Sequence, residues 1–351
     1  MKLYLIVFAA VCSLLPIAGY ADSGAVTESA PVFNGTEGIS IDFIAPEPGT
    51  QASRFHGKKV LFIDSYHKGY SWSDTTRQGV YHVLKPAGVR LLDVQMDTKR
   101  NGTETFKKQA ALKIKAIIEQ WQPEVVIASD DNASKYLVAE YYKNASLPFV
   151  FCGVNWDASV YGYPFENVTG MEEVALVPQM FKELELYARG NRKGILNGDD
   201  LSEHKTVSNF RKKLGIRFDK EVYVRNFAEW KQKYLELQDT VDMMIVGSTA
   251  SLPDWNDKAA EAFVLENTVI PSGTTEIWLM PQSLVGYIKL GEEQGGYAAQ
   301  TALKILDGAA AKEIPIVANK RARIMLNFKL SQKLSIMFDT SSLKNAEIFR
   351  R

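Results

Sequence analysis

Apolar runs of strand length alternate with amphipathic stretches of helical length along most of this 351-residue sequence, and this alternation constrains the fold most. The strand-like runs are 60–63, 89–94, 125–128, 149–152, 194–196, 221–224, 243–246 and 268–270. The helix candidates are 73–85, 104–121, 132–143, 176–189, 203–214, 228–239, 256–266 and 292–307. Near-continuous apolar strands separated by helices are typical of parallel sheets that helices cover on both faces. The sequence therefore predicts an α/β protein.

The strand-like runs fit either one large sheet or two smaller ones, and two features favour two Rossmann-like lobes. The runs fall into two groups, which the less regular segment 153–174 separates. An extended segment, 313–317, follows the last long helix and contains Pro315, so it can cross between lobes. We expect the first lobe to comprise residues 58–172 and 286–312, and the second lobe to comprise residues 173–285 and 313–351.

The N-terminus has the composition of an export signal. Lys2 precedes an apolar run, 3–18, and small residues lie at the positions expected before a cleavage site after Ala21. An apolar core this short is typical of a secretory signal peptide, with an uncleaved anchor as the alternative. We therefore expect residues 1–21 to be a signal peptide, and residues 22–57, rich in Ser, Gly, Thr, Ala and Pro, to form a flexible tether.

Cysteine usage agrees with export into a bacterial periplasm. Cleavage after Ala21 would leave one cysteine, Cys152, and therefore no disulfide within the chain. An exported protein without disulfides fits a periplasm better than a small extracellular scaffold. Cys152 lies in the apolar run 148–153, which predicts a buried structural thiol rather than a nucleophile.

Charge balance and motifs argue against several classes of function. Lys plus Arg and Asp plus Glu both number 41, so no basic field exists to attract nucleic acid. None of the 4 histidines has metal-ligand spacing to another, and no nucleophile elbow, phosphate loop or HExxH motif occurs. Asp64, Ser65 and His67 share one loop and cannot easily adopt the geometry of a catalytic triad. We expect no enzyme activity, no cofactor and no metal.

Polar and aromatic side chains follow nearly every predicted strand. In open parallel sheets, ligands bind beyond the carboxyl ends of the strands, where loops lead into helices. The candidate ligand-binding residues at these ends are Ser65, Tyr66, Tyr70, Trp72, Ser129, Asp130, Asp131, Asn132, Asn155, Trp156, Asp199, Ser248 and Thr249. Taken singly, Ser, Thr, Asp and Asn at such positions are also ordinary helix caps. Taken together, these residues predict a polar-lined cleft between the lobes.

These residue types suit a small organic solute. Helix N-termini behind the loops favour anionic groups such as a carboxylate, whereas Asp130 and Asp131 suit a cationic group. The four aromatic residues offer flat surfaces to a ring, an alkyl chain or a cation. Alternatively, the aromatic residues pack the lobe surface or the hinge, and which of Tyr66, Tyr70 and Trp72 faces a ligand stays open.

Five segments of the sequence carry a family resemblance. They are VLFIDSYHKGYSWSD (60–74), ASDDNA (128–133), PFVFCGVN (148–155), NVTGM (167–171) and GYIKLGEEQGGYAAQTALKILDGAAAKEIPI (286–316). Together they resemble the ABC transporter substrate-binding protein family, in the branch with type I periplasmic-binding-protein folds that includes tryptophan- and tyrosine-binding members. The resemblance implies two α/β lobes, three hinge crossings and an enclosed ligand. It puts ligand contacts at 65–72, 129–132, Asn155, Asp199 and 248–249.

The resemblance and the loops predict an exported, monomeric, periplasmic solute-binding protein. Its two lobes would close over a small molecule, amino-acid-like or with an aromatic or hydrophobic part, and deliver it to an ABC transporter permease. Related sequences with the SYH-GY-W and SDDNA patterns also look like sensor modules, so a ligand-sensing partner of a membrane histidine kinase or chemoreceptor is the alternative. A periplasmic enzyme on the same fold is a third hypothesis.

Overall fold

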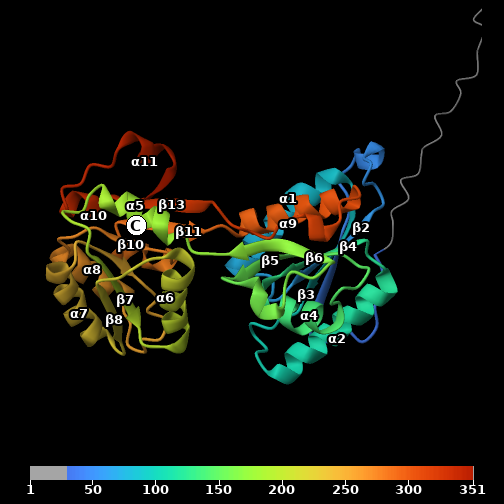
Figure 1. The fold of residues 1–351 in the computed structure, drawn as a ribbon, viewed down its shortest axis with the longest axis horizontal. Helices are drawn as coiled ribbons and strands as arrows, with labels where there is room; N and C mark the ends of the chain where they lie inside the picture. Colours follow the sequence, from blue (N-terminus) through green and yellow to red (C-terminus); the bar gives the residue numbers. More distant parts are fainter. Residues whose placement is uncertain (1–29, 351) are drawn as a thin grey trace, which may run out of the picture. The chain divides into compact units, whose positions relative to one another are not determined.

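The computed structural model describes residues 30–350, which contain two mixed β-sheets of seven strands each. Helices alternate with the strands along the chain. This arrangement confirms the predicted α/β class with two lobes (Figure 1). The predicted signal peptide, 1–21, lies outside the described residues. Cys152 is buried, as expected of a structural thiol, and burial raises the pKa of its thiol.

The first sheet has the strand order β1-β3-β2-β4-β5-β6-β12 and is parallel except for the β1–β3 pair. Its strands are β1 (Ser40–Ile44), β2 (Lys59–Asp64), β3 (Arg90–Gln95), β4 (Val125–Ser129), β5 (Phe149–Asn155), β6 (Val168–Glu173) and β12 (Val317–Ala318). Its helices are α1 (Ser71–Ala87), α2 (Glu104–Trp121), α3 (Asp130–Ala133), α4 (Ala139–Tyr141) and α9 (Gly291–Leu306). A π-helical turn, Ser134–Val138, joins α3 to α4.

Helices cover both faces of the first sheet, because successive strand residues point to opposite sides. Helices α1 and α9 lie side by side against Val60 and Phe62, whereas α2 packs against Leu61 and Ile63 (Figure 1). The close approach of α1 and α9 requires glycine. A Cβ on Gly79 would lie 2.5 Å from the Glu292 carbonyl oxygen.

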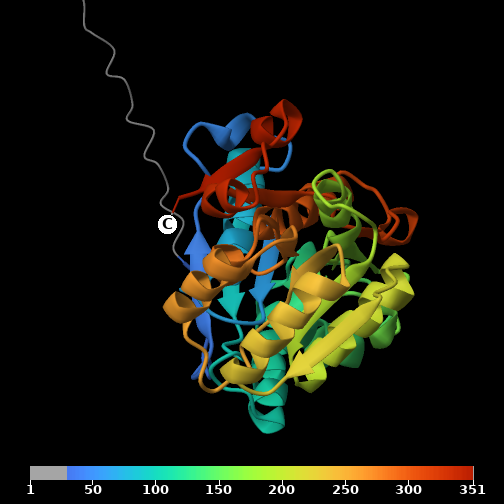
Figure 2. The same ribbon diagram turned by 90° about the vertical axis from the view of Figure 1, so that its left-hand side faces the viewer.

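The second sheet has the order β14-β13-β11-β10-β9-β7-β8. Its strands are β7 (Lys193–Gly198), β8 (Lys220–Val224), β9 (Met243–Val246), β10 (Ser272–Thr274), β11 (Val285–Lys289), β13 (Ala322–Asn327) and β14 (Ala346–Phe349). Its helices are α5 (Val177–Glu185), α6 (Leu201–Leu214), α7 (Phe227–Thr240), α8 (Asp257–Asn267), α10 (Phe328–Lys333) and α11 (Thr340–Lys344). Helices α5 and α6 pack beside Ile195, and α7 and α8 beside Leu196, so both faces are again covered (Figure 2).

Three segments cross between the lobes, at 174–176, at 290 and at 319–321. The strand pairing differs from the expected lobe ranges at two places. Strand β11 belongs to the second sheet, so the crossing follows Lys289 rather than residue 285. Strand β12 pairs with β6 of the first sheet, so the last crossing lies after Ala318 rather than at 313.

Two local expectations were wrong. Strand β1 lies within the expected tether, 22–57, because Ile41 and Phe43 pack on the core and β1 pairs with β3, which makes β1 the edge strand of the first sheet. The strand expected at 268–270 is absent from the described structure, where β10 begins at Ser272. The Gln238 side chain accepts the N–H groups of Val269 and Ile270, which therefore do not join the sheet.

Candidate functional site

Ser65 ties together the carboxyl ends of β2 and β4. Its hydroxyl donates to the Ser129 carbonyl (2.6 Å) and accepts the N–H of Ala133 (2.9 Å). The Thr98 hydroxyl donates to the Ser65 carbonyl (2.5 Å) and accepts from the Asn132 side chain (2.8 Å). The structure therefore brings Ser65, Ser129 and Asn132 together, as expected for neighbouring parallel strands, and uses their polar groups to fix the loops.

Asp130 is buried at the start of α3 in a conformation that few non-glycine residues adopt. Its φ is 70°, and only 1% of its surface is exposed. The carboxylate accepts the Trp72 indole N–H (2.9 Å) and the Ser129 hydroxyl (2.8 Å). Burial, and then the nearby carboxylates of Asp64 and Glu173, hold the pKa of Asp130 well above its usual range. Strained, buried polar residues of this kind are concentrated at functional sites.

Asp131 points its carboxylate to a different pair of donors. Asn155 donates to one oxygen (2.8 Å) and the Tyr161 hydroxyl donates to the other (2.8 Å). Asn155 is exposed, and Asp131 and Tyr161 are partly buried, so these three side chains form an accessible polar group. Tyr161 was missed by sequence reasoning because it lies in an irregular segment rather than directly after a strand.

Tyr66 and Tyr70 form an aromatic corner beside these carboxylates. Their rings meet edge to face with centroids 5.3 Å apart. The Lys99 ammonium lies 5.1 Å from the Tyr66 centroid and 4.9 Å from the Tyr70 centroid, which is the geometry of a cation–π contact. Burial and the charge of Asp130 raise the pKa of the Tyr66 hydroxyl. The corner therefore already contacts one positive charge, that of Lys99.

Trp156 contacts the second lobe. Its φ is 66°, and its ring meets Phe210 of α6 edge to face, with centroids 5.5 Å apart. The neighbouring Asp157 accepts from Lys213 of the same helix (2.5 Å). Trp156 therefore packs against α6, which is the alternative that the sequence left open for the aromatic residues.

The second-lobe candidates lie at the ends of the neighbouring strands β7 and β9. Asp199 accepts from His204 (2.9 Å) and Arg225 (2.8 Å), and these hydrogen bonds lower its pKa. The Ser248 carbonyl accepts the N–H of Gly198 (2.8 Å), and the adjacent Thr249 is buried. Asp199 is thus paired within its own lobe.

A second acidic group lies at the start of α6. The pKa of Glu203 rises from 4.5 to about 7, first because the side chain is partly buried and then because the Asp200 and Glu276 carboxylates repel its charge. Burial also raises the pKa of Glu276, and the Lys289 ammonium opposes that shift. The first and second lobes therefore both present carboxylates near the crossings.

The pH dependence of stability should reveal Glu203. Because the folded state binds this proton more tightly than the unfolded state, the residue's contribution to stability is lost as pH rises from about 4.5 to 7. We expect Glu203→Gln to remove this loss, so that the variant gains stability relative to the wild type across that window. Urea unfolding at several pH values measures the effect.

The control is Glu236→Gln, because Lys233 lowers the pKa of Glu236 instead. Parallel profiles for wild type and Glu203→Gln would contradict the assignment.

Side chains that the sequence reading missed bind the crossings to one another. Lys289, at the end of β11, pairs with the buried Glu173 at the end of β6. The Asn319 side chain accepts the N–H of Val174 (2.7 Å). Sequence separations of 116 and 145 residues explain why neither pair was predicted.

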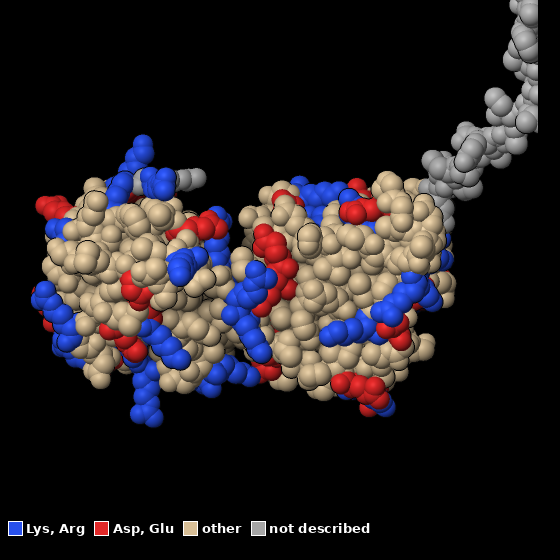
Figure 3. All heavy atoms as spheres, turned by 90° about the horizontal axis from the view of Figure 1, so that it is seen from above, with Lys and Arg blue, Asp and Glu red and all other residues tan. Residues whose placement is uncertain are grey.

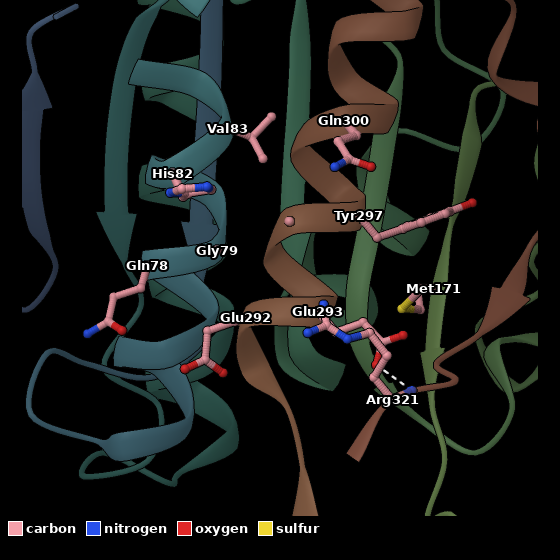
Figure 4. Close-up of a pocket in the computed structure, with 11 residues that line it drawn as sticks. Gln78, Gly79, His82, Val83, Met171, Glu292, Glu293, Tyr297, Gln300 and Arg321 are labelled. Atoms are coloured by element: carbon pink, nitrogen blue, oxygen red, sulfur yellow. Dashed lines mark hydrogen bonds between the residues drawn. The ribbon is translucent and has the colours of Figure 1, made fainter. Parts of the chain in front are cut away.

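Glu293 anchors the third crossing to α9. Its carboxylate accepts the N–H groups of Lys320 (3.0 Å) and Arg321 (2.9 Å), the latter shown as the dashed line in Figure 4. A surface pocket of about 570 Å³ lies here, with Gly79 of α1 and Tyr297 of α9 in its lining (Figure 4). This pocket lies between two helices rather than at the strand ends, so it is separate from the candidate ligand site.

Three further observations concern metal ligands, membrane spans and surface charge. Between residues 30 and 350, no cluster of three or more His, Cys, Asp and Glu side chains could hold a metal ion. In the same range, no helix has both the length and the apolar character needed to cross a membrane. Figure 3 shows charges of both signs scattered over one face.

Comparisons with known proteins identify the fold. No protein-family model matches the sequence, and no curated protein matches it. The ligand-free, open structure of CD0873, a substrate binding protein with adhesive properties from Clostridium difficile, is similar with a TM-score of 0.64 and 16% identity, covering 83% of this chain and 99% of that one. A periplasmic ribose ABC transporter structure from Conexibacter woesei has a TM-score of 0.51 and 13% identity, covering 84% and 100%. A conserved domain protein from Vibrio cholerae has a TM-score of 0.51 and 17% identity, covering 83% and 99%. These likenesses, with the two sheets and three crossings, show the type I periplasmic-binding-protein fold.

Proposed function

We propose that this protein is an exported solute-binding protein, which closes its two lobes over a small molecule and delivers it to an ABC transporter. The observation that carries the proposal is the set of aromatic and hydrogen-bonding side chains at the carboxyl ends of β2, β4 and β5, beside three chain crossings. Such crossings act as hinges when domains close on a ligand. Similarity of fold to a substrate binding protein and to a periplasmic ribose ABC transporter supports the proposal.

The proposed ligand is amino-acid-like, or another small solute with an aromatic or hydrophobic part. Asp131, Asn155 and Tyr161 offer an accessible carboxylate with neighbouring polar groups, which suits an ammonium group. The partly buried Trp72 and the Tyr66–Tyr70 corner offer flat surfaces for an apolar or cationic part. The site as proposed needs no covalent chemistry, because burial and hydrogen bonding supply the affinity.

The proposed location is the periplasm, and the proposed working form is a monomer that meets a membrane permease. The N-terminal composition of residues 1–21 supports export. The buried Cys152 supports a chain that needs no disulfide there.

A thermal-shift screen of amino acids, amines and sugars tests the proposed function. A solute that binds only the folded state, present at a free concentration of 100 times its Kd, stabilises that state by about 2.7 kcal/mol. This raises the midpoint of thermal unfolding by several degrees. We expect amino-acid-like or aromatic solutes to raise the midpoint, and sugars to leave it unchanged. A set of sugars as the sole stabilisers would overturn the proposed ligand class, and no stabiliser at all would count against solute binding.

A further inference from the structure

Strand β5 contains a bulge next to Asp130. Phe151 pairs with Gly170 and Val154 pairs with Glu172, so two residues of β5, Cys152 and Gly153, lie opposite one residue of β6. Gly153 has a φ of 69°, which favours glycine. Bulges of this kind commonly redirect side chains beside functional sites.

The bulge leaves room for the Asp130 carboxylate. A Cβ on Gly153 would lie 2.8 Å from Oδ1 of Asp130, which is closer than Cβ atoms in proteins approach a neighbouring heavy atom. The same Oδ1 atom accepts the Trp72 indole N–H at 2.9 Å. The bulge, the carboxylate and the indole are therefore in direct contact, one after the other.

Gln294 fills the gap that the bulge makes in the sheet. Only 1% of its surface is exposed, and it lies in the first turn of α9, directly after the second crossing. Its Oε1 atom accepts the Gly153 N–H (2.9 Å), and its Nε2 atom donates to the Glu172 carbonyl (3.2 Å). Both ends of one amide thus span the bulge, and each satisfies a backbone group that a regular ladder would otherwise pair.

We propose that Gln294 is a positioning residue for the candidate ligand site: it holds the Gly153 bulge, which seats Asp130, which in turn fixes the Trp72 indole. Asp130 then acts as a support behind Trp72, because its two oxygens already accept the indole and the Ser129 hydroxyl. The consequence for solute affinity rests on the proposed function, whereas the positioning of Trp72 does not.

The test uses the ¹⁵N-labelled, ligand-free protein and the indole N–H signals of its 6 tryptophans. Trp72→Phe identifies the Trp72 signal. We expect Gln294→Met to displace that signal, although the Gln294 amide bonds Gly153 and Glu172 rather than the indole, and to speed exchange of the Gly153 amide about fivefold or more. Gln294→Glu keeps an acceptor for Gly153, so that amide should stay protected. The control is Gln300→Met, an exposed residue of the same helix, which should change neither signal.

A second variant keeps the test decisive if Gln294→Met fails to fold. Gly153→Ala places a methyl group against the Asp130 carboxylate and should also displace the Trp72 signal. When Gln294→Met folds, a displacement of the Trp72 signal beyond that of Gln300→Met supports the proposal, and a signal left where Gln300→Met leaves it overturns the proposal. When Gln294→Met does not fold, Gly153→Ala decides in the same way whether the bulge positions Trp72. Because no ligand is present, this outcome is independent of the thermal-shift screen.

Discussion

Replacing Arg77 with methionine is expected to lower the free energy of unfolding by about 3–5 kcal/mol, because the change leaves buried carboxylates without their cation. Arg77 is 6% exposed and bonds Asp64 (2.6 Å) and Asp93 (2.7 Å), neither of which is exposed at all. It also pairs with the partly exposed Asp74 (2.9 Å). Urea unfolding at neutral pH, read from the tryptophan fluorescence, measures the loss.

The matched control is Arg100→Met. Arg100 pairs with Asp97 at a similar distance (2.6 Å), but its side chain is 61% exposed. Exposed pairs contribute about 0–1 kcal/mol, so this variant should unfold close to the wild type. Equal, small losses for the two variants would show that the buried cluster is less important than its burial indicates.

The Arg77 cluster also bears on the candidate site. Asp64 ends β2 and accepts the N–H of Tyr66 (2.9 Å) and the hydroxyl of Ser73 (2.8 Å). The cluster therefore holds both ends of the segment 66–73, which contains Tyr70 and, in the first turn of α1, Trp72. The stability of the protein and the geometry of the candidate site therefore depend on the same buried charges.

Trp72→Ala is expected to weaken solute binding about 10- to 100-fold while leaving the protein folded, because large aromatic residues at binding sites carry much of the affinity. The solute is the one that gives the largest thermal shift with the wild type, and calorimetry measures its Kd. Trp72 is only partly buried, so its loss should cost far less stability than that of Arg77.

The control for Trp72 is Tyr141→Ala. Tyr141 is an exposed aromatic residue at the C-terminal end of α4, whereas the candidate site lies where strands end and helices begin. Its removal should leave the Kd within about twofold of the wild type. An unchanged Kd in Trp72→Ala, or an equal loss in both variants, would show that the solute binds elsewhere.

Much of the fold could be predicted from the sequence because strand-like runs and helices differ in period and composition. The runs at 60–63 and 243–246, for example, lie within β2 and β9. Strand β1 was missed because it lies among Gly, Ser and Pro residues, and the pairing that makes it a strand comes from β3. The run at 268–270 was wrongly predicted to be a strand, because the side chain of Gln238, about thirty residues earlier, binds its backbone N–H groups.

The candidate site was only partly predictable, for a related reason. Strand ends are marked in the sequence, so Ser65, Ser129 and Asp130 could be named. Their hydrogen-bond partners come from distant segments, as Gln294 does for Gly153, 141 residues away. Local sequence also gives no sign that Asp130 adopts a positive φ and is buried behind Trp72. Those properties arise from the bulge and from packing.

The most direct test of solute binding is native mass spectrometry of protein purified from its own source, with Trp72→Ala purified in parallel. The account predicts a noncovalent small-molecule adduct on the wild type, released on gentle activation, and a much weaker adduct on Trp72→Ala. Wild-type protein that carries no adduct, even after incubation with every solute of the thermal-shift screen, would contradict the account. The same would follow from an adduct of equal strength on both proteins.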